Sequence, residues 1–286
     1  MNRESNARDV LITGLAPVIW GSTYLITTEM LPLGYPLTTS MLRALPAGIL
    51  LLLLVRQLPD RHWLGRVFLL GALNFSVFWW LLFIAAYRLP GGVAATLGAM
   101  QFLFVIVLSR GLLGTKIHTS ALIAAVAGML GVALLILTPA AKLDPVGIAA
   151  GIGSAVAMAL GTVLSRRWQP AVNTLTFTSW QLTAGGILLV PAAWFFEPAL
   201  PSLTLVNIAG FLYLGLLGAA FTYIIWFRGI ARLSPNLVAP LGFLSPLSAV
   251  MLGWLILGQA LSVPQILGIV VVLGSVWFSQ QRKTSS

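Results

Sequence analysis

Long apolar runs, broken at short intervals by charges, prolines and glycines, make up most of the chain. A helix that crosses the hydrocarbon core of a bilayer needs about 20 predominantly apolar residues, and runs of that kind recur along the whole sequence. Because only short polar connections separate the runs, the pattern predicts ten transmembrane helices. We place them at residues 10–30, 37–55, 64–86, 93–109, 121–137, 146–164, 174–195, 206–227, 235–257 and 264–278.

The composition supports this interpretation and excludes several other classes. Of the 286 residues, 59% are hydrophobic and only 8% are Asp, Glu, Lys or Arg. A soluble domain carries roughly a quarter charged residues, because its surface must be solvated. The composition therefore argues against a soluble enzyme, a nucleic-acid-binding protein and a disordered chain. The predicted fold class is an all-α polytopic membrane protein.

Lysine and arginine predict how the helices are oriented. When the N-terminus is placed in the cytoplasm and the helices alternate, all but three of the 16 Lys and Arg residues fall on the cytoplasmic side. The exceptions are Arg88 and Lys142 in outer loops and Arg43 inside the second helix. Cytoplasmic loops carry such an excess, so we expect both termini in the cytoplasm of a bacterial-type inner membrane. Topology thus explains the net charge of +10 without a nucleic-acid partner.

The two halves of the sequence resemble each other at a nearly constant offset. Segment 83–89 (FIAAYRL) is similar to 227–233 (FRGIARL), 144 positions later, and 47–51 (AGILL) is similar to 185–189 (GGILL). Five helices in each half would place the second half upside down relative to the first. This is the inverted-repeat plan of many secondary transporters, which bind substrate near the membrane midplane, between the repeats. The predicted repeats span residues 1–140 and 141–286.

Several short motifs make the chain similar to a known family. They are Trp-Gly-Ser-Thr-Tyr at 20–24, Arg-Leu-Ser-Pro at 232–235, Leu-Ser-Pro-Leu at 244–247 and Leu-Gly at 257–258. In their order they resemble the drug/metabolite transporter superfamily, EamA type, and within it the YddG-like amino acid exporters. The resemblance implies ten helices, a central cavity and export of small metabolites. Members often carry Glu after the Leu-Gly that ends the fourth and ninth helices; here Thr115 and Gln259 stand there, which puts any role of that Glu in doubt.

Ionisable residues inside the predicted helices are few, and this narrows the chemistry. The acids lie in loops or at helix ends, with Glu29 at the outer end of the first helix. Because a charged group inside a membrane is costly and usually functional, the lack of a mid-membrane carboxylate favours a facilitator over a proton-coupled antiporter. The sequence also offers no paired membrane acids, no membrane Ser–His pair, no metal-ligand cluster and no phosphate-binding loop. We therefore expect no enzyme activity, metal or cofactor.

Arg43 is the one charge well inside a predicted helix. It lies about 9 Å from the outer end, at about 1.5 Å per residue. Its side chain could snorkel to the outer interface or pair with Glu29. It could instead serve as an outer gate or contact a substrate carboxylate, and the sequence leaves these alternatives open.

Polar and aromatic side chains near mid-membrane are the candidate cavity residues. A polar group at this depth must face protein or water rather than lipid, so these residues either line a cavity or bond neighbouring helices. Interior prolines in helices 1, 2 and 9 predict kinks, which could serve as gates or simply bend the helices. The candidate residues are Trp20, Thr23, Tyr24, Asn74, Phe78, Trp79, Thr96, Met100, Gln101, Met158, Thr162, Thr222, Tyr223, Trp226 and Ser245.

These features predict a transporter that exports small amphipathic metabolites, above all amino acids including aromatic ones. It would work by alternating access as a facilitator. An efflux transporter for drugs or aromatic cations with the same fold is the alternative, and a non-transporting membrane scaffold is the alternative of a different class. The expected partners are a small-molecule substrate and the lipid bilayer, with no nucleic acid. The aliphatic helices at 121–137 and 264–278 could also meet in a homodimer.

Overall fold

The computed structural model describes residues 3–32, 34–88, 97–136, 144–258 and 262–281, and these residues form helices without any strand. Two π-helical turns, η1 and η2, interrupt longer helices. The elements are α1 (Arg3–Met30), α2 (Pro36–Val55), α3 (Arg61–Gly71), η1 (Ala72–Ser76), α4 (Val77–Arg88), α6 (Gln101–Leu113), α7 (Thr119–Ile136), α8 (Pro145–Arg167), α9 (Thr174–Phe196), α10 (Leu205–Gly215), η2 (Leu216–Phe221), α11 (Thr222–Arg232), α12 (Pro235–Leu241), α13 (Leu244–Leu257) and α14 (Val263–Gln281).

The described helices have the length and surface of membrane spans. Seven are long and apolar enough to cross a bilayer, and three shorter apolar helices accompany them. Large apolar side chains face outward, with Leu53 66% exposed, Leu54 67% exposed and Trp194 82% exposed. Such a surface is unfavourable in water and is solvated by lipid tails. The chain is therefore a polytopic α-helical membrane protein, as its composition predicts.

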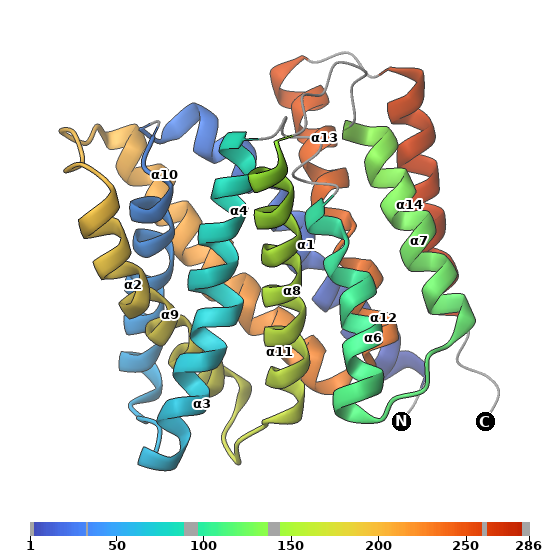
Figure 1. The fold of residues 1–286 in the computed structure, drawn as a ribbon, viewed down its shortest axis with the longest axis horizontal. Coiled ribbons are helices and arrows are strands. Elements are labelled where there is room, and N and C mark those ends of the chain that lie inside the picture. The colour runs from blue at the N-terminus through green and yellow to red at the C-terminus, as the bar shows by residue number, and fades with distance from the viewer. Residues whose placement is uncertain (1–2, 33, 89–96, 137–143, 259–261, 282–286) are drawn as a thin grey trace.

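Helices from the two halves of the chain pack against one another (Figure 1). α2 lies along α9 at one side of the bundle, and α7 lies along α14 at the other. Between them, α4 contacts α8 while α11 contacts α1, and α13 contacts α1 while α6 contacts α8. In the predicted repeat the corresponding helices are α1 and α8, α2 and α9, α4 and α11, α6 and α13, and α7 and α14. When each helix is replaced by its counterpart, this set of contacting pairs stays the same.

The interruptions of the helices differ in part from those expected at prolines. α1 and α2 run through Pro17 and Pro46 unbroken, whereas the chain does break between α12, which contains Pro240, and α13, which contains Pro246. The π turns η1 and η2 were not predicted from the sequence. η2 begins 144 positions after η1, the same offset as in the sequence repeat.

Two glycines allow α2 and α9 to approach closely. A Cβ atom added to Gly48 would lie 2.5 Å from the main-chain nitrogen of Thr183, and one added to Gly186 would lie 2.6 Å from Cα of Leu45. No real side chain fits at such distances from a backbone. Small residues at helix crossings are typical of membrane bundles, and here they fix the contact between the two halves.

Asp144 begins α8 outside the apolar span. Its Oδ1 accepts a hydrogen bond of 2.9 Å from the Gly147 amide, and Arg88 Nη1 lies 3.4 Å from its other oxygen. A carboxylate at a helix N-cap satisfies a main-chain donor that has no partner within the helix. The Gly147 bond, with a smaller contribution from Arg88, holds the pKa of Asp144 below its ordinary value of 3.8.

Candidate functional site

A narrow pocket lies between α6 of the first half and α8, α11 and α12 of the second. Its accessible volume of about 20 Å³ holds a water molecule, so a larger solute needs the surrounding helices to move apart. Three residues selected from the sequence, Gln101, Thr162 and Trp226, lie on its wall although they come from three different helices. The complete lining is Gln101, Phe102, Val105, Ser109, Thr162, Val163, Arg166, Trp226, Ile230, Leu233, Pro235, Val238 and Ala239.

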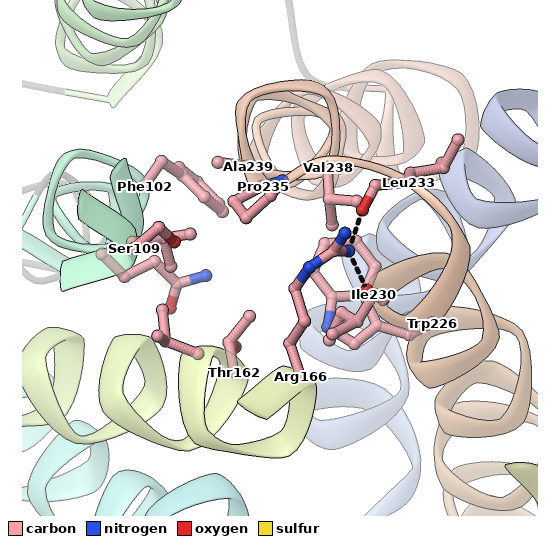
Figure 2. Close-up of a pocket in the computed structure, with 13 residues that line it drawn as sticks. Phe102, Ser109, Thr162, Arg166, Trp226, Ile230, Leu233, Pro235, Val238 and Ala239 are labelled. Atoms are coloured by element: carbon pink, nitrogen blue, oxygen red, sulfur yellow. Dashed lines mark hydrogen bonds between the residues drawn. The ribbon is translucent and has the colours of Figure 1, made fainter. Parts of the chain in front are cut away.

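The wall of this pocket is mostly apolar, with a few polar groups. Figure 2 shows Phe102 and Ser109 across the pocket from Arg166. Ser109 is fully buried and Trp226 is 2% exposed. Ser109 Oγ and Trp226 Nε1 have no hydrogen-bond partner within the part of the chain that the structure describes. A buried polar atom left unpaired costs free energy, so both atoms are suited to bind a polar group that enters the pocket.

Arg166 supplies the positive charge of the pocket. Its Nη1 donates to the carbonyl oxygens of Ile230 and Leu233, at the C-terminal end of α11 (Figure 2). The last carbonyls of a helix lack partners within the helix and carry partial negative charge, so they position the guanidinium at the pocket. The neighbouring Arg167 is exposed. From the sequence both arginines were predicted to serve topology alone, and neither Arg166 nor Ser109 was among the candidate cavity residues.

An aromatic cluster, formed by Trp20, Phe75, Trp79, Tyr223 and Trp226, adjoins the pocket through Trp226. The ring centroid of Trp20 lies 5.0 Å from that of Tyr223 and 5.2 Å from that of Trp226. Phe75 lies 4.7 Å from Tyr223 and 5.5 Å from Trp79, in edge-to-face contacts. Such geometries are favourable for aromatic pairs. The structure thus brings four of the predicted cavity residues together, with Phe75 as an addition.

The π turn η2 supplies a main-chain hydrogen-bond acceptor, the carbonyl oxygen of Gly218, next to residues of this cluster. The carbonyl of Gly218 accepts a 2.7 Å bond from Arg43 Nη2 and a 2.9 Å bond from the Thr222 hydroxyl, which itself accepts a 2.8 Å bond from Trp20 Nε1. The Arg43 guanidinium also lies over the Trp79 ring, 5.0 Å from its centroid. These contacts connect α1, α2 and the second half of the chain. Arg43 lies outside the pocket lining, and its predicted role as a gate or carboxylate contact stays a prediction.

Asn74 belongs to a different polar cluster, which bonds helices rather than lining this pocket. It is fully buried in η1, and its Nδ2 donates to Ser165 Oγ at 3.1 Å and to Gln181 Oε1 at 2.9 Å. Ser165 Oγ lies 3.1 Å from the same Gln181 oxygen. The cluster joins η1, α8 and α9. Of the two roles that the sequence left open for such a polar residue, cavity lining or bonding between helices, the observed contacts of Asn74 are those of bonding between helices.

The other predicted residues lie outside the pocket lining. Phe78 and Met158 pack in the apolar core around the aromatic cluster. Thr23, Met100 and Ser245 are half-buried, and Glu29 is exposed. The side chain of Tyr24 and all of Thr96 lie outside the described residues.

Asp9, predicted from the sequence only as an acid in a loop or at a helix end, is buried. Its residue is 6% exposed, its Oδ1 lies 2.6 Å from Arg228 Nη2, and Arg232 Nη1 is 3.7 Å away. The carboxylate on α1 thus pairs with two cations of α11. No signal in the sequence specifies this pair, because the partners are more than 200 positions apart.

Comparisons with known proteins agree with this architecture. The EamA-like transporter family matches the chain twice, over residues 9–137 and 145–280. Protein PecM of Dickeya dadantii (strain 3937) is 47% identical over 263 residues, which cover 91% of this chain and 88% of PecM. The uncharacterized inner membrane transporter YedA of Escherichia coli (strain K12) is 30% identical over 269 residues, which cover 91% of this chain and 86% of YedA.

A solved crystal structure with 19% sequence identity superposes with a TM-score of 0.82, covering 96% of this chain and 97% of the other. At that identity the match supports the fold alone. The family matches and relatives confirm the resemblance drawn from the motifs. The chain belongs to the EamA-like transporter family and is a multi-pass membrane transporter rather than an enzyme.

Proposed function

We propose that this transporter is a facilitator that exports small amphipathic metabolites, in particular amino acids including aromatic ones, by alternating access. The observation that carries the proposal is the pocket itself. Gln101 of the first half and Thr162 and Trp226 of the second line the same mostly apolar space. An apolar space with a few convergent polar groups suits a solute that has an apolar body and a polar head.

The proposal includes ten membrane-spanning helices in two inverted repeats, 1–140 and 141–286. The exchangeable helix pairs support this plan, as do the two π turns 144 positions apart and the two successive family matches. In transporters of this plan one repeat rocks against the other around a substrate site between them. A pocket with walls from both halves is placed where such a motion would open and close it.

The direction of transport rests on the position of the pocket along the helices. Its lining extends from Gln101 to Ser109 on α6 and from Thr162 to Arg166 on α8, toward the ends of both helices. The distribution of Lys and Arg assigns these ends to the cytoplasm. A pocket that reaches the cytoplasmic side is placed to load solute from the cell interior, as export requires.

The facilitator mechanism rests on the charges near the pocket. The described lining residues include no acid that could carry a proton. The buried Asp9 is engaged in an ion pair with Arg228 and lies outside the pocket lining. Both observations support downhill movement of the solute without proton exchange.

Flux of a labelled amino acid panel into proteoliposomes, with and without an imposed pH gradient, tests the function. We expect saturable flux along the solute gradient that does not respond to the pH gradient. Thr162→Phe should lower it at least tenfold by filling the pocket. The matched control is Thr119→Phe, an exposed position at the start of α7, which should transport normally. Flux of aromatic cations in place of amino acids would establish the drug exporter, and no flux of any solute would favour the scaffold.

A further inference from the structure

We propose that Arg166, Ser109 and Trp226 form a subsite for the carboxylate of the transported solute. This inference rests on the proposed function, because it takes the pocket as the solute cavity. It goes further by naming the head group that the pocket selects. Aromatic and aliphatic carboxylates, including amino acids through their carboxylate end, are the solutes that it would accept, and amines without a carboxylate are the solutes that it would reject.

The charge of the pocket carries the first step. Arg166 is the only ionisable side chain among the described residues that line it. Around this cation the wall is mostly apolar, and an apolar wall screens charge far less than water does. A carboxylate entering the pocket therefore meets an opposite charge, whereas an ammonium group meets a like charge and no acid.

The unpaired donors carry the second step. Ser109 Oγ and Trp226 Nε1 are both buried, and neither has a partner within the described structure. An indole N–H can only donate, and a hydroxyl can donate or accept. A carboxylate only accepts, with two oxygens that can each take more than one bond. A carboxylate can therefore accept from either atom and from the guanidinium, whereas an ammonium group has no acceptor to offer the indole.

The geometry of Arg166 carries the third step. Its bonds to Ile230 and Leu233 both use Nη1. A guanidinium has five N–H donors in a planar fork, and the fork suits two-oxygen recognition of a carboxylate. The carbonyls at the end of α11 thus hold one nitrogen while the side chain lines the pocket. Arg167 is exposed, so the chain provides a neighbouring arginine of equal charge as a control.

Binding to the detergent-purified full chain, measured by isothermal titration calorimetry at pH 7, tests the subsite apart from transport. The probes share a phenyl ring and differ in head group: 3-phenylpropionate is an anion, phenylalanine a zwitterion and phenethylamine a cation. We expect 3-phenylpropionate to bind at least tenfold more tightly than phenethylamine. Phenylalanine should fall between them.

The variants identify the groups responsible. Arg166→Gln should lower the anion-to-cation affinity ratio at least tenfold, whereas Arg167→Gln should leave it within twofold of the parent. Because Arg166 also bonds the end of α11, Arg166→Gln could fail to fold. Two milder variants keep the subsite testable in that case. Trp226→Phe keeps an aromatic ring without the indole donor, and Ser109→Ala removes one hydroxyl. Each variant should lower the affinity for 3-phenylpropionate at least threefold and the affinity for phenethylamine by a smaller factor.

Three results would overturn the subsite: phenethylamine binding as tightly as 3-phenylpropionate, no binding of any probe, or equal affinity ratios in the two arginine variants. Flux measured in parallel separates this inference from the proposed function. Selective anion binding without flux would refute transport of these solutes and leave the subsite standing. Amino acid flux with an affinity ratio insensitive to Arg166→Gln would refute the subsite and leave the transport function standing.

Discussion

The buried ion pair between Asp9 and Arg228 joins the first helix to the second half of the chain, and its removal has a calculable cost. Two unit charges about 4 Å apart attract by about 4 kcal/mol at an effective dielectric constant of about 20. Breaking a buried pair by removing one partner costs roughly 3–5 kcal/mol, since the other charge remains buried. The Asp9 side chain is 8% exposed but that of Arg228 is 26% exposed, so water compensates part of the loss.

We therefore expect Asp9→Asn to lower the free energy of unfolding by about 2 kcal/mol, below the fully buried case. For a chain of 286 residues that corresponds to a melting temperature lower by roughly 3 °C. The side chain keeps nearly the same shape, so the loss reports charge rather than packing. Thermal unfolding of the detergent-purified protein, followed by light scattering or size-exclusion chromatography after heating, measures the shift.

A second ion pair provides the matched control. Arg88 and Asp144 lie 3.4 Å apart with side chains 49% and 36% exposed, and exposed ion pairs contribute little to stability because water and salt screen them. Asp144→Asn keeps an N-cap residue on α8, so its melting temperature should fall by less than half as much as that of Asp9→Asn. The double variant Asp9→Asn with Arg228→Gln should recover part of the loss, because the remaining partner of Asp9, Arg232, has a side chain that is 56% exposed and solvated by water. Equal shifts for both Asp variants would refute the reasoning from burial.

Three further predictions concern packing, topology and pH. Gly48→Ala should lower stability by about 2 kcal/mol through a clash with the backbone of α9, whereas Gly65→Ala, whose Cβ meets nothing within 4 Å, should raise it by about 0.5 kcal/mol; melting curves of both variants compare the two. Because the sequence has no cysteine, a single introduced cysteine reports on which side of the membrane it lies. A membrane-impermeant thiol reagent should label Thr204→Cys in intact cells and Gln57→Cys only after permeabilisation. The reverse labelling pattern would show the opposite orientation. The depressed pKa of Asp144 means that its cap is formed above the unfolded value of 3.8 and is lost as pH falls through the lower folded value, so Asp144→Asn should make stability less sensitive to acid between about pH 5 and 2.

Several helices could be located from the sequence because the membrane imposes one strong rule on them. Every span must be about 20 apolar residues long and must satisfy its own backbone, so apolar length and interrupting charges locate it. The observed α2 (Pro36–Val55) and α9 (Thr174–Phe196) match the predicted ranges within a residue or two. The π turns were missed because no single residue type encodes them; each depends on how neighbouring helices hold a local extra residue.

The pocket residues were predicted less completely, because a polar side chain at mid-membrane depth can either line a cavity or bond a neighbouring helix. Asn74 and Gln101 are both amides near mid-membrane, yet Asn74 bonds Ser165 and Gln181 while Gln101 lines the pocket. The difference lies in which neighbouring helix approaches each face. Depth and polarity narrow the candidates, and only the packing of helices far apart in sequence separates them.

The adjacent arginines at the end of α8 show the same limit for charge. Arg166 and Arg167 contribute equally to the excess of cations on one side of the membrane, and in sequence they are interchangeable. Consecutive residues of a helix point about 100° apart, however, so when the last turn of α8 packs beside α11, one side chain turns toward the carbonyls of Ile230 and Leu233 and the other toward the exterior. A cation that serves topology can thus also supply the charge of a pocket. Replacing each of the two arginines by glutamine in turn therefore separates the role of charge in membrane orientation from its role in solute recognition.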